Sequence, residues 1–65
     1  MQVIVNGQDY RLEKGSTIAG LLNLLDLDGK LAVEINRSII PCSNFGSHTI
    51  NPGDTIEIIR AIGGG

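Results

Sequence analysis

The most unusual residues of this 65-residue chain stand together at its C-terminus. Gly63, Gly64 and Gly65 directly follow DTIEIIRAI, the most strand-like stretch of the sequence. Glycine has no side chain to bury or to react. Either this ending has no role, or the terminal carboxylate is itself the working group.

The side chains that carry reactive groups form no catalytic or metal-binding pattern. Cys42 is the sole cysteine, so it has no second thiol for an internal disulfide, a zinc site or an iron–sulfur cluster. His48 has no nucleophile or metal ligand at a useful spacing, and Asp26, Asp28 and Asp54 fall where solvation or local capping explains them. We expect no catalytic residue, no metal and no bound cofactor, and therefore not an enzyme.

Charge and hydropathy narrow the choice of partners. Seven acidic residues against five basic ones give a net charge of −2, and no basic run is present. Binding to a phosphate backbone requires clustered Lys and Arg, so we expect no nucleic acid partner. No segment approaches the roughly 18 apolar residues that span a bilayer, and no secretion signal is evident. We expect no membrane association and a cytoplasmic location.

The first thirteen residues predict a β-hairpin. In MQVIV, Met1, Val3 and Val5 alternate onto one face of a strand, which leaves Ile4 on the other face. Asn-Gly at 6–7 is the strongest short signal for a type I′ turn. QDYRLE should therefore pair back as a second strand.

The next segment predicts one helix. Ser16 is the expected N-cap, and apolar residues recur from Ile18 to Leu25 with helical spacing. A helix of nine or ten residues does not persist alone in water, so its apolar stripe must pack on the sheet. Gly29 is expected to close this segment as a helix exit or a turn.

The remaining segments predict two or three further strands. LAVEIN at 31–36 alternates, RSIIP at 37–41 forms a short strand that ends at Pro41, and TIEIIRAI at 55–62 is the last strand. NPGD at 51–54 is a turn, and the loop before it anchors on the core through Phe45 and Ile50. The expected fold class is α+β: a mixed sheet of four to five strands with one helix across one face, the first and last strands parallel at its centre.

The opening MQVIVNGQ, the helix GSTIAGLLNLL, LAVEINRSIIP, GDTIEIIRAI and the terminal GGG together resemble the ThiS family, the small sulfur carriers of thiamin biosynthesis. The similarity extends over essentially the whole chain. It implies the ubiquitin-like β-grasp fold, with a β-grasp domain at 1–62 and a flexible reactive tail at 63–65.

The resemblance also implies an activity that resides on the C-terminal carboxylate. An ATP-dependent adenylyltransferase resembling the ubiquitin-activating enzymes would adenylate Gly65, and a sulfur donor system would convert the adenylate to a thiocarboxylate. Thiazole synthase would then take the sulfur for thiazole formation. Gly63 and Gly64 would thread the terminus into the partners' active sites.

On the sheet face without a helix, Ile4, Ile59 and Ala61, with Ile62 beside the tail, are expected to form an apolar surface that binds both partners. Two alternatives stay open. One is a sulfur carrier of the type of the small subunit of molybdopterin synthase, which has the same ending. The other is a non-catalytic β-grasp binding module.

Overall fold

A computed structural model of the chain describes residues 1–60. The predictions for Ala61, Ile62, Gly63, Gly64 and Gly65 lie outside the described residues. The described residues form seven elements: β1 (Gln2–Val5), β2 (Gln8–Arg11), α1 (Ile18–Leu24), β3 (Leu31–Ile35), β4 (Ser38–Ile40), the 3-10 helix η1 (Cys42–Asn44) and β5 (Thr55–Arg60).

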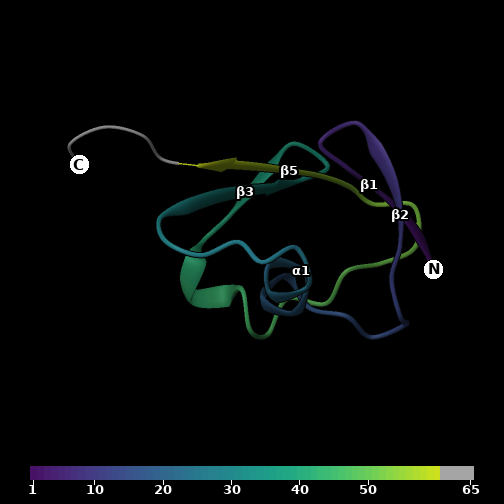
Figure 1. Cartoon of the computed structure of the whole chain (residues 1–65), viewed down its shortest axis with the longest axis horizontal. Coiled ribbons are helices and arrows are strands. Elements are labelled where there is room, and N and C mark those ends of the chain that lie inside the picture. Colours follow the sequence, from purple (N-terminus) through teal and green to yellow (C-terminus); the bar gives the residue numbers. More distant parts are fainter. Residues whose placement is uncertain (61–65) are drawn as a thin grey trace.

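The strands form one mixed sheet in the order β2-β1-β5-β3-β4. The first and last strands, β1 and β5, lie side by side and parallel, and the other neighbouring pairs are antiparallel. Figure 1 shows α1 below the sheet, with the opposite sheet face uncovered. The predicted fold class and the parallel central pair are confirmed.

Two hairpins have turns of the same type. Asn6 and Gly7 both have positive φ values, 50° and 81°, as the predicted type I′ turn requires. Asn36 and Arg37 connect β3 to β4 in the same way, with φ values of 51° and 72°. The sequence reading placed these two residues in strands. It was wrong there because Asn-Arg lacks the glycine that usually marks such a turn.

The helix begins one residue later than predicted. The N-cap is Thr17, whose Oγ1 accepts a hydrogen bond from the backbone N–H of Gly20 at 3.1 Å. The hydroxyl of Ser16 instead donates to the carbonyl of Glu13 at 2.7 Å. The prediction of Ser16 as the cap is therefore wrong: its hydroxyl is engaged by the preceding turn. The helix has 7 residues, fewer than the nine or ten expected.

The helix ends through Asp26 rather than through Gly29. Asp26 has a φ of 57°, and its N–H donates to the carbonyl of Asn23, while the N–H of Leu27 donates to the carbonyl of Leu22. This pair of bonds is the Schellman arrangement, which is usually completed by glycine. Gly29 also has positive φ, 88°, but it lies in the loop that follows. Gly29 is therefore not the exit residue; of the two roles that the sequence allowed, it lies in the bend that follows the helix.

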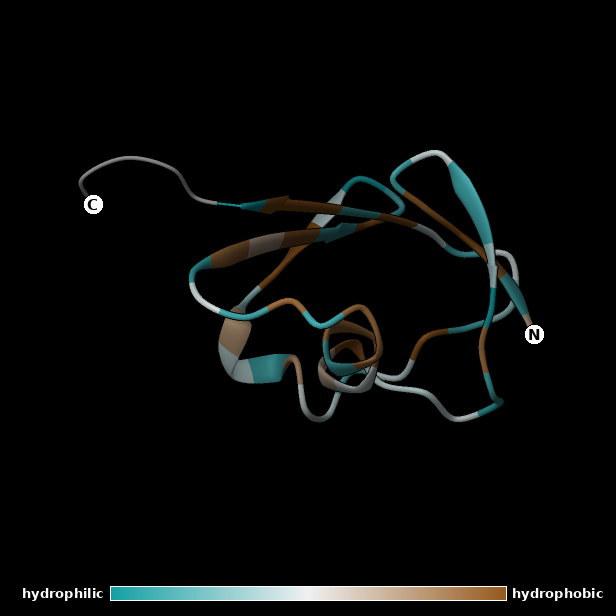
Figure 2. Cartoon of the chain, in the orientation of Figure 1, coloured by the Kyte–Doolittle hydropathy of each residue, from teal (hydrophilic) through white to brown (hydrophobic). Residues whose placement is uncertain are grey.

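The core lies between the sheet and the helix, and Figure 2 shows apolar segments in both. The predicted alternation is confirmed for Val3, Val5, Val33, Ile56 and Ile58, all of which are buried. Leu25 is only partly buried, at the frayed end of the helical stripe. The predicted loop anchors hold as well: Ile50 is buried and Phe45 packs against the core. The buried hydrophobic residues are Val3, Val5, Leu12, Ile18, Leu21, Leu22, Val33, Ile35, Ile50, Ile56 and Ile58.

Candidate docking face and the strand that leads to the C-terminus

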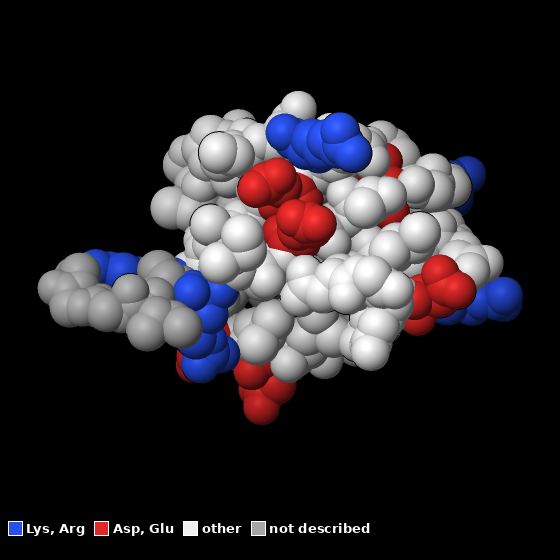
Figure 3. Space-filling view, turned by 90° about the horizontal axis from the view of Figure 1, so that it is seen from above, with Lys and Arg blue, Asp and Glu red and all other residues white. Residues whose placement is uncertain are grey.

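The open sheet face carries three exposed isoleucines. Ile4 is 38% exposed, Ile59 is 52% exposed and Ile39 is 74% exposed. Each lies on the face away from α1, because a residue next to it in the same strand is buried or packs on the core: Val3 and Val5 beside Ile4, Ile40 beside Ile39, and Ile58 beside Ile59. The open sheet face, defined by these residues and those between them, is the uncovered surface seen in Figure 3.

The sheet register sets how these isoleucines are spaced. Ile4 lies opposite Thr55, and Ile59 lies opposite the exposed Ala32. Thr55 and Ile59 are four residues apart in one strand, which corresponds to about 13 Å at 3.3 Å per residue. Ile4 and Ile59 therefore share the face that the sequence predicted but stand apart on it, with Glu57 in the interval.

Ile39 was not among the expected surface residues. It lies directly opposite Glu34 across the β3–β4 pair, so it belongs to the same face. Ile40 lies opposite the buried Val33, so by alternation Ile39 must point to the other face of the sheet. The segment was too short for the sequence alone to fix that register.

Two acidic residues stand in the middle of the open sheet face. Glu34 in β3 is directly opposite Glu57 in β5. Figure 3 shows acidic side chains gathered near the centre of the face, beside a basic one and surrounded by uncharged residues. With Asn36, Arg37 and Thr55, the two glutamates line a hollow of about 410 Å³.

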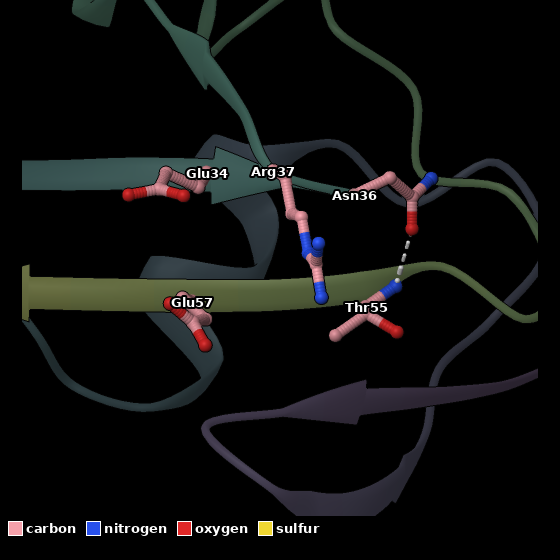
Figure 4. Close-up of a pocket in the computed structure, with 5 residues that line it drawn as sticks. All are labelled: Glu34, Asn36, Arg37, Thr55 and Glu57. Atoms are coloured by element: carbon pink, nitrogen blue, oxygen red, sulfur yellow. Dashed lines mark hydrogen bonds between the residues drawn. The ribbon is translucent and has the colours of Figure 1, made fainter.

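Figure 4 shows how this hollow is arranged. The carboxylates of Glu34 and Glu57 lie over neighbouring strands, while Arg37 extends from the β3–β4 turn across β5. Among the five residues drawn, the hydrogen bond present joins the Thr55 N–H to Asn36 Oδ1, at 3.0 Å. Among the residues drawn, no hydrogen bond joins Arg37 to either glutamate.

Asparagine side chains fix both halves of β5. Asn6 Oδ1 accepts from the Ile58 N–H at 2.8 Å, and Asn6 Nδ2 donates to the Ile58 carbonyl at 3.3 Å. Asn36 accepts from the Thr55 N–H and donates to Asp54 Oδ1 at 3.0 Å. The strand that leads toward the C-terminus is thus held from both neighbouring hairpin turns.

Asp54 has the local capping role that the sequence indicated. It is 8% exposed, and its second oxygen accepts from the backbone N–H of Asn51 at 2.9 Å. Together with the bond from Asn36, this satisfies both carboxylate oxygens and closes the turn before β5. Asp54 is therefore a structural residue.

The remaining candidates are dispersed over the described part of the chain. Cys42 is exposed in η1, and the carbonyl of His48 accepts from the Ile18 N–H at 3.2 Å. In residues 1–60, no group of three or more His, Cys, Asp or Glu side chains is placed to hold a metal ion. None of the helices described there is long and apolar enough to cross a membrane.

Comparison with known proteins decides the family. Residues 3–65 match the ThiS family, which is more than half of the chain. The chain belongs to the ThiS family. The resemblance found in the sequence is confirmed, and the match extends over the terminal glycines.

Relatives and solved structures agree with this assignment. The sulfur carrier protein ThiS of Escherichia coli is 33% identical over 66 residues, with full coverage of both chains. The crystal structure of the ThiS protein of Geobacter metallireducens superimposes with a TM-score of 0.85 at 26% identity, again with full coverage of both. The β-grasp architecture of this ThiS-family chain is thereby confirmed.

Another relative has a different name and a much longer chain. A thiazole synthase of Paramagnetospirillum magneticum is 38% identical over 66 residues. The match covers this whole chain but 20% of that protein, and the same share of a second thiazole synthase from Magnetococcus marinus. The chain therefore spans about a fifth of the length of these two relatives.

Proposed function

We propose that this chain is a sulfur carrier of thiamin biosynthesis that bears its sulfur as a thiocarboxylate on Gly65. The observation that carries the proposal is the full-length match to a ThiS sulfur carrier, over a sequence that finishes on glycines. In this role the protein is a cosubstrate of other enzymes and catalyses no reaction itself.

The chemistry needs only a carboxylate and an activating partner. A carboxylate oxygen attacks the α-phosphorus of ATP, pyrophosphate leaves, and an acyl adenylate forms on Gly65. A sulfide equivalent from a donor system then attacks the acyl carbon and AMP leaves. The adenylyltransferase binds the ATP, so no cofactor needs to reside on the carrier. We propose a cytoplasmic location because the activating step consumes ATP.

The three glycines suit delivery of this group. They extend by about 10 Å when fully stretched, and without Cβ atoms they fit a narrow channel. Ordering each one costs about 1–2 kcal/mol of backbone entropy with no side-chain contact in return. The binding energy must therefore come from the folded domain.

The open sheet face is our candidate for that binding. Ile4 and Ile59 are exposed on it, and β5 leads from it toward Ala61 and Ile62. We assign these four residues to partner docking, with Ile39 added from the structure. Because one face cannot hold two proteins at once, the adenylyltransferase and thiazole synthase should compete for it.

The names of the relatives favour thiazole synthase as the sulfur acceptor over the large subunit of molybdopterin synthase. Two relatives named thiazole synthase include a segment similar to this chain. A binding module without a reactive terminus would leave the full-length similarity to a sulfur carrier unexplained.

The direct test is intact-mass measurement after incubation with ATP, the adenylyltransferase and a sulfur source. We expect exchange of one oxygen for sulfur, localised to Gly65 by fragmentation. Removal of Gly65 should abolish the exchange. Sulfur found on Cys42 as a persulfide, with an unmodified terminus, would overturn the assignment.

A further inference from the structure

The pairing of Glu34 with Glu57 is unfavourable within the chain. The two residues are directly opposite in an antiparallel pair, where cross-strand side chains lie closest. Like charges in such positions destabilise a sheet. Arg37 lines the same hollow, but Figure 4 shows no hydrogen bond from it to either carboxylate. Among the residues drawn there, the two carboxylates thus have no hydrogen-bonded basic partner.

The surroundings of the pair are those of a protein-binding surface. Ile39 flanks Glu34 on β4, and Ile59 follows two residues after Glu57 on β5. Both isoleucines are more than half exposed. Charged groups ringed by apolar ones become strong contacts when a partner excludes water from them.

The two carboxylates line a hollow of about 410 Å³ (Figure 4), and Figure 3 shows acidic side chains near the centre of the uncovered face. A guanidinium matches this arrangement best, because its planar fork of donors can bind two carboxylates at once and its face can lie on aliphatic side chains. A lysine ammonium, as a compact and strongly hydrated charge, fits it less well.

We propose that Glu34 and Glu57 together receive an arginine side chain of thiazole synthase, and that this contact fixes the register in which the synthase docks on the open sheet face. The inference rests on the proposed function and names the chemistry of its partner. The synthase is the occupant because, in two relatives of that name, a segment similar to this whole chain is part of the same polypeptide. A tethered domain spends most of its time near its partner.

Glu57 on β5 should also affect how the C-terminus is delivered to the synthase. Glu57 lies three residues before Arg60, the last described residue of the strand that leads to the glycines. An arginine bound there fixes the strand relative to the synthase surface. Loss of the contact should therefore weaken binding and also slow sulfur transfer from the bound complex.

The test compares the double substitution E34Q/E57Q with E13Q/D28N, which removes the same charge from exposed residues in loops outside the sheet. Affinity of each full-length protein for thiazole synthase is measured by calorimetry at low and high salt. We expect E34Q/E57Q to weaken binding at least about tenfold and to lose most of its salt dependence, because desolvated charge pairs contribute strongly to affinity. The E13Q/D28N control should bind within about twofold of the unmodified chain, as is usual for charges outside an interface.

The stability of each variant shows whether a loss of affinity for thiazole synthase is due to misfolding. Relief of the like-charge pair should leave the denaturation midpoint of E34Q/E57Q equal to or above that of the unmodified chain. Weaker binding by a protein of equal or greater stability supports the proposal. Unchanged affinity, or equal losses in both double variants, would overturn it.

Three further outcomes are distinguishable. If the unmodified chain sediments as a dimer that E34Q/E57Q converts to a monomer, a second copy occupies the face and the synthase assignment is wrong. If the unmodified chain never acquires sulfur on Gly65, the proposed function fails. If it acquires sulfur normally while E34Q/E57Q binds the synthase as well as the unmodified chain does, only the arginine contact fails.

Discussion

The side chain of Asn6 holds the backbone of Ile58 by two hydrogen bonds, one to the N–H at 2.8 Å and one to the carbonyl at 3.3 Å. β1 pairs with β5 at Ile4 and Val5 and then turns away at Asn6. The amide thus continues the pairing of β5 for one more step beyond the end of its neighbour. Ile58 is two residues from the end of the described strand, so this contact holds β5 close to that end.

Asn6→Gly should destabilise the fold by about 1–3 kcal/mol, the usual cost of leaving partly buried backbone groups without partners. Glycine tolerates the positive φ at this position, so the substitution removes the amide without straining the turn. Urea unfolding measures the loss, and hydrogen exchange should show reduced protection of the Ile58 amide. Asn6→Asp keeps the acceptor oxygen, so its stability should lie between those of the unmodified chain and Asn6→Gly. Equal stability and equal exchange in Asn6→Gly would show that the contact is dispensable.

Asp26→Gly should stabilise the fold by about 1 kcal/mol. Asp26 occupies the left-handed position of the helix exit, where a side chain is unfavourable and glycine is preferred. The matched control is Asp28→Gly, because Asp28 has no positive φ and should lose stability or stay unchanged. Chemical denaturation of both variants tests the assignment. A gain in Asp28→Gly with none in Asp26→Gly would contradict it.

Ile59→Glu should weaken binding to the adenylyltransferase and to thiazole synthase by at least about tenfold, since it removes an apolar contact from the docking face and adds a charge beside the acidic pair there. Leu24→Glu is the control, because Leu24 is an equally prominent surface hydrophobic, 65% exposed, on the helix side of the molecule. Surface plasmon resonance with each partner gives the affinities. A fall in affinity for only one of the two partners would exclude a shared docking face.

Gly64→Ala should reduce formation of the thiocarboxylate by at least about tenfold while changing stability by less than about 0.5 kcal/mol. The added Cβ limits the φ values open to this residue and makes the chain wider where it must enter the partner's active site. Gly46→Ala is the control: an added Cβ there meets no atom within 4 Å, and φ is not positive. Rates come from mass spectrometry under single-turnover conditions. Equal rates in all three proteins would exclude a steric demand at this glycine.

Period-two and helical patterns in the sequence predicted the strands, the helix and most of the core. Val3, Val33 and Ile56 lie where alternation places them, and Asn6-Gly7 forms its turn, because these features depend on neighbours along the chain. The caps were harder to predict. Ser16 and Thr17 are both good N-caps, and the choice depended on the bond from Ser16 to Glu13.

The centre of the open sheet face could not be predicted in the same way. Glu34 and Glu57 are far apart in sequence, and they meet because of the register between β3 and β5. Ile39 lies in a three-residue strand that is too short for a reliable pattern, and it took its face from the pairing with Glu34. Contacts of this kind depend on the assembled sheet, whereas the terminal glycines are visible in the sequence itself.

The central claim is that the free carboxylate of Gly65 is the reactive group and that the folded domain positions it. The most direct measurement compares sulfur delivery to thiazole by the natural chain and by a semisynthetic chain whose C-terminus is blocked as an amide, each with ATP, the adenylyltransferase, a sulfur source and thiazole synthase. We predict that the blocked chain folds with the same unfolding midpoint and delivers no sulfur. Delivery by the blocked chain at the natural rate would contradict the account.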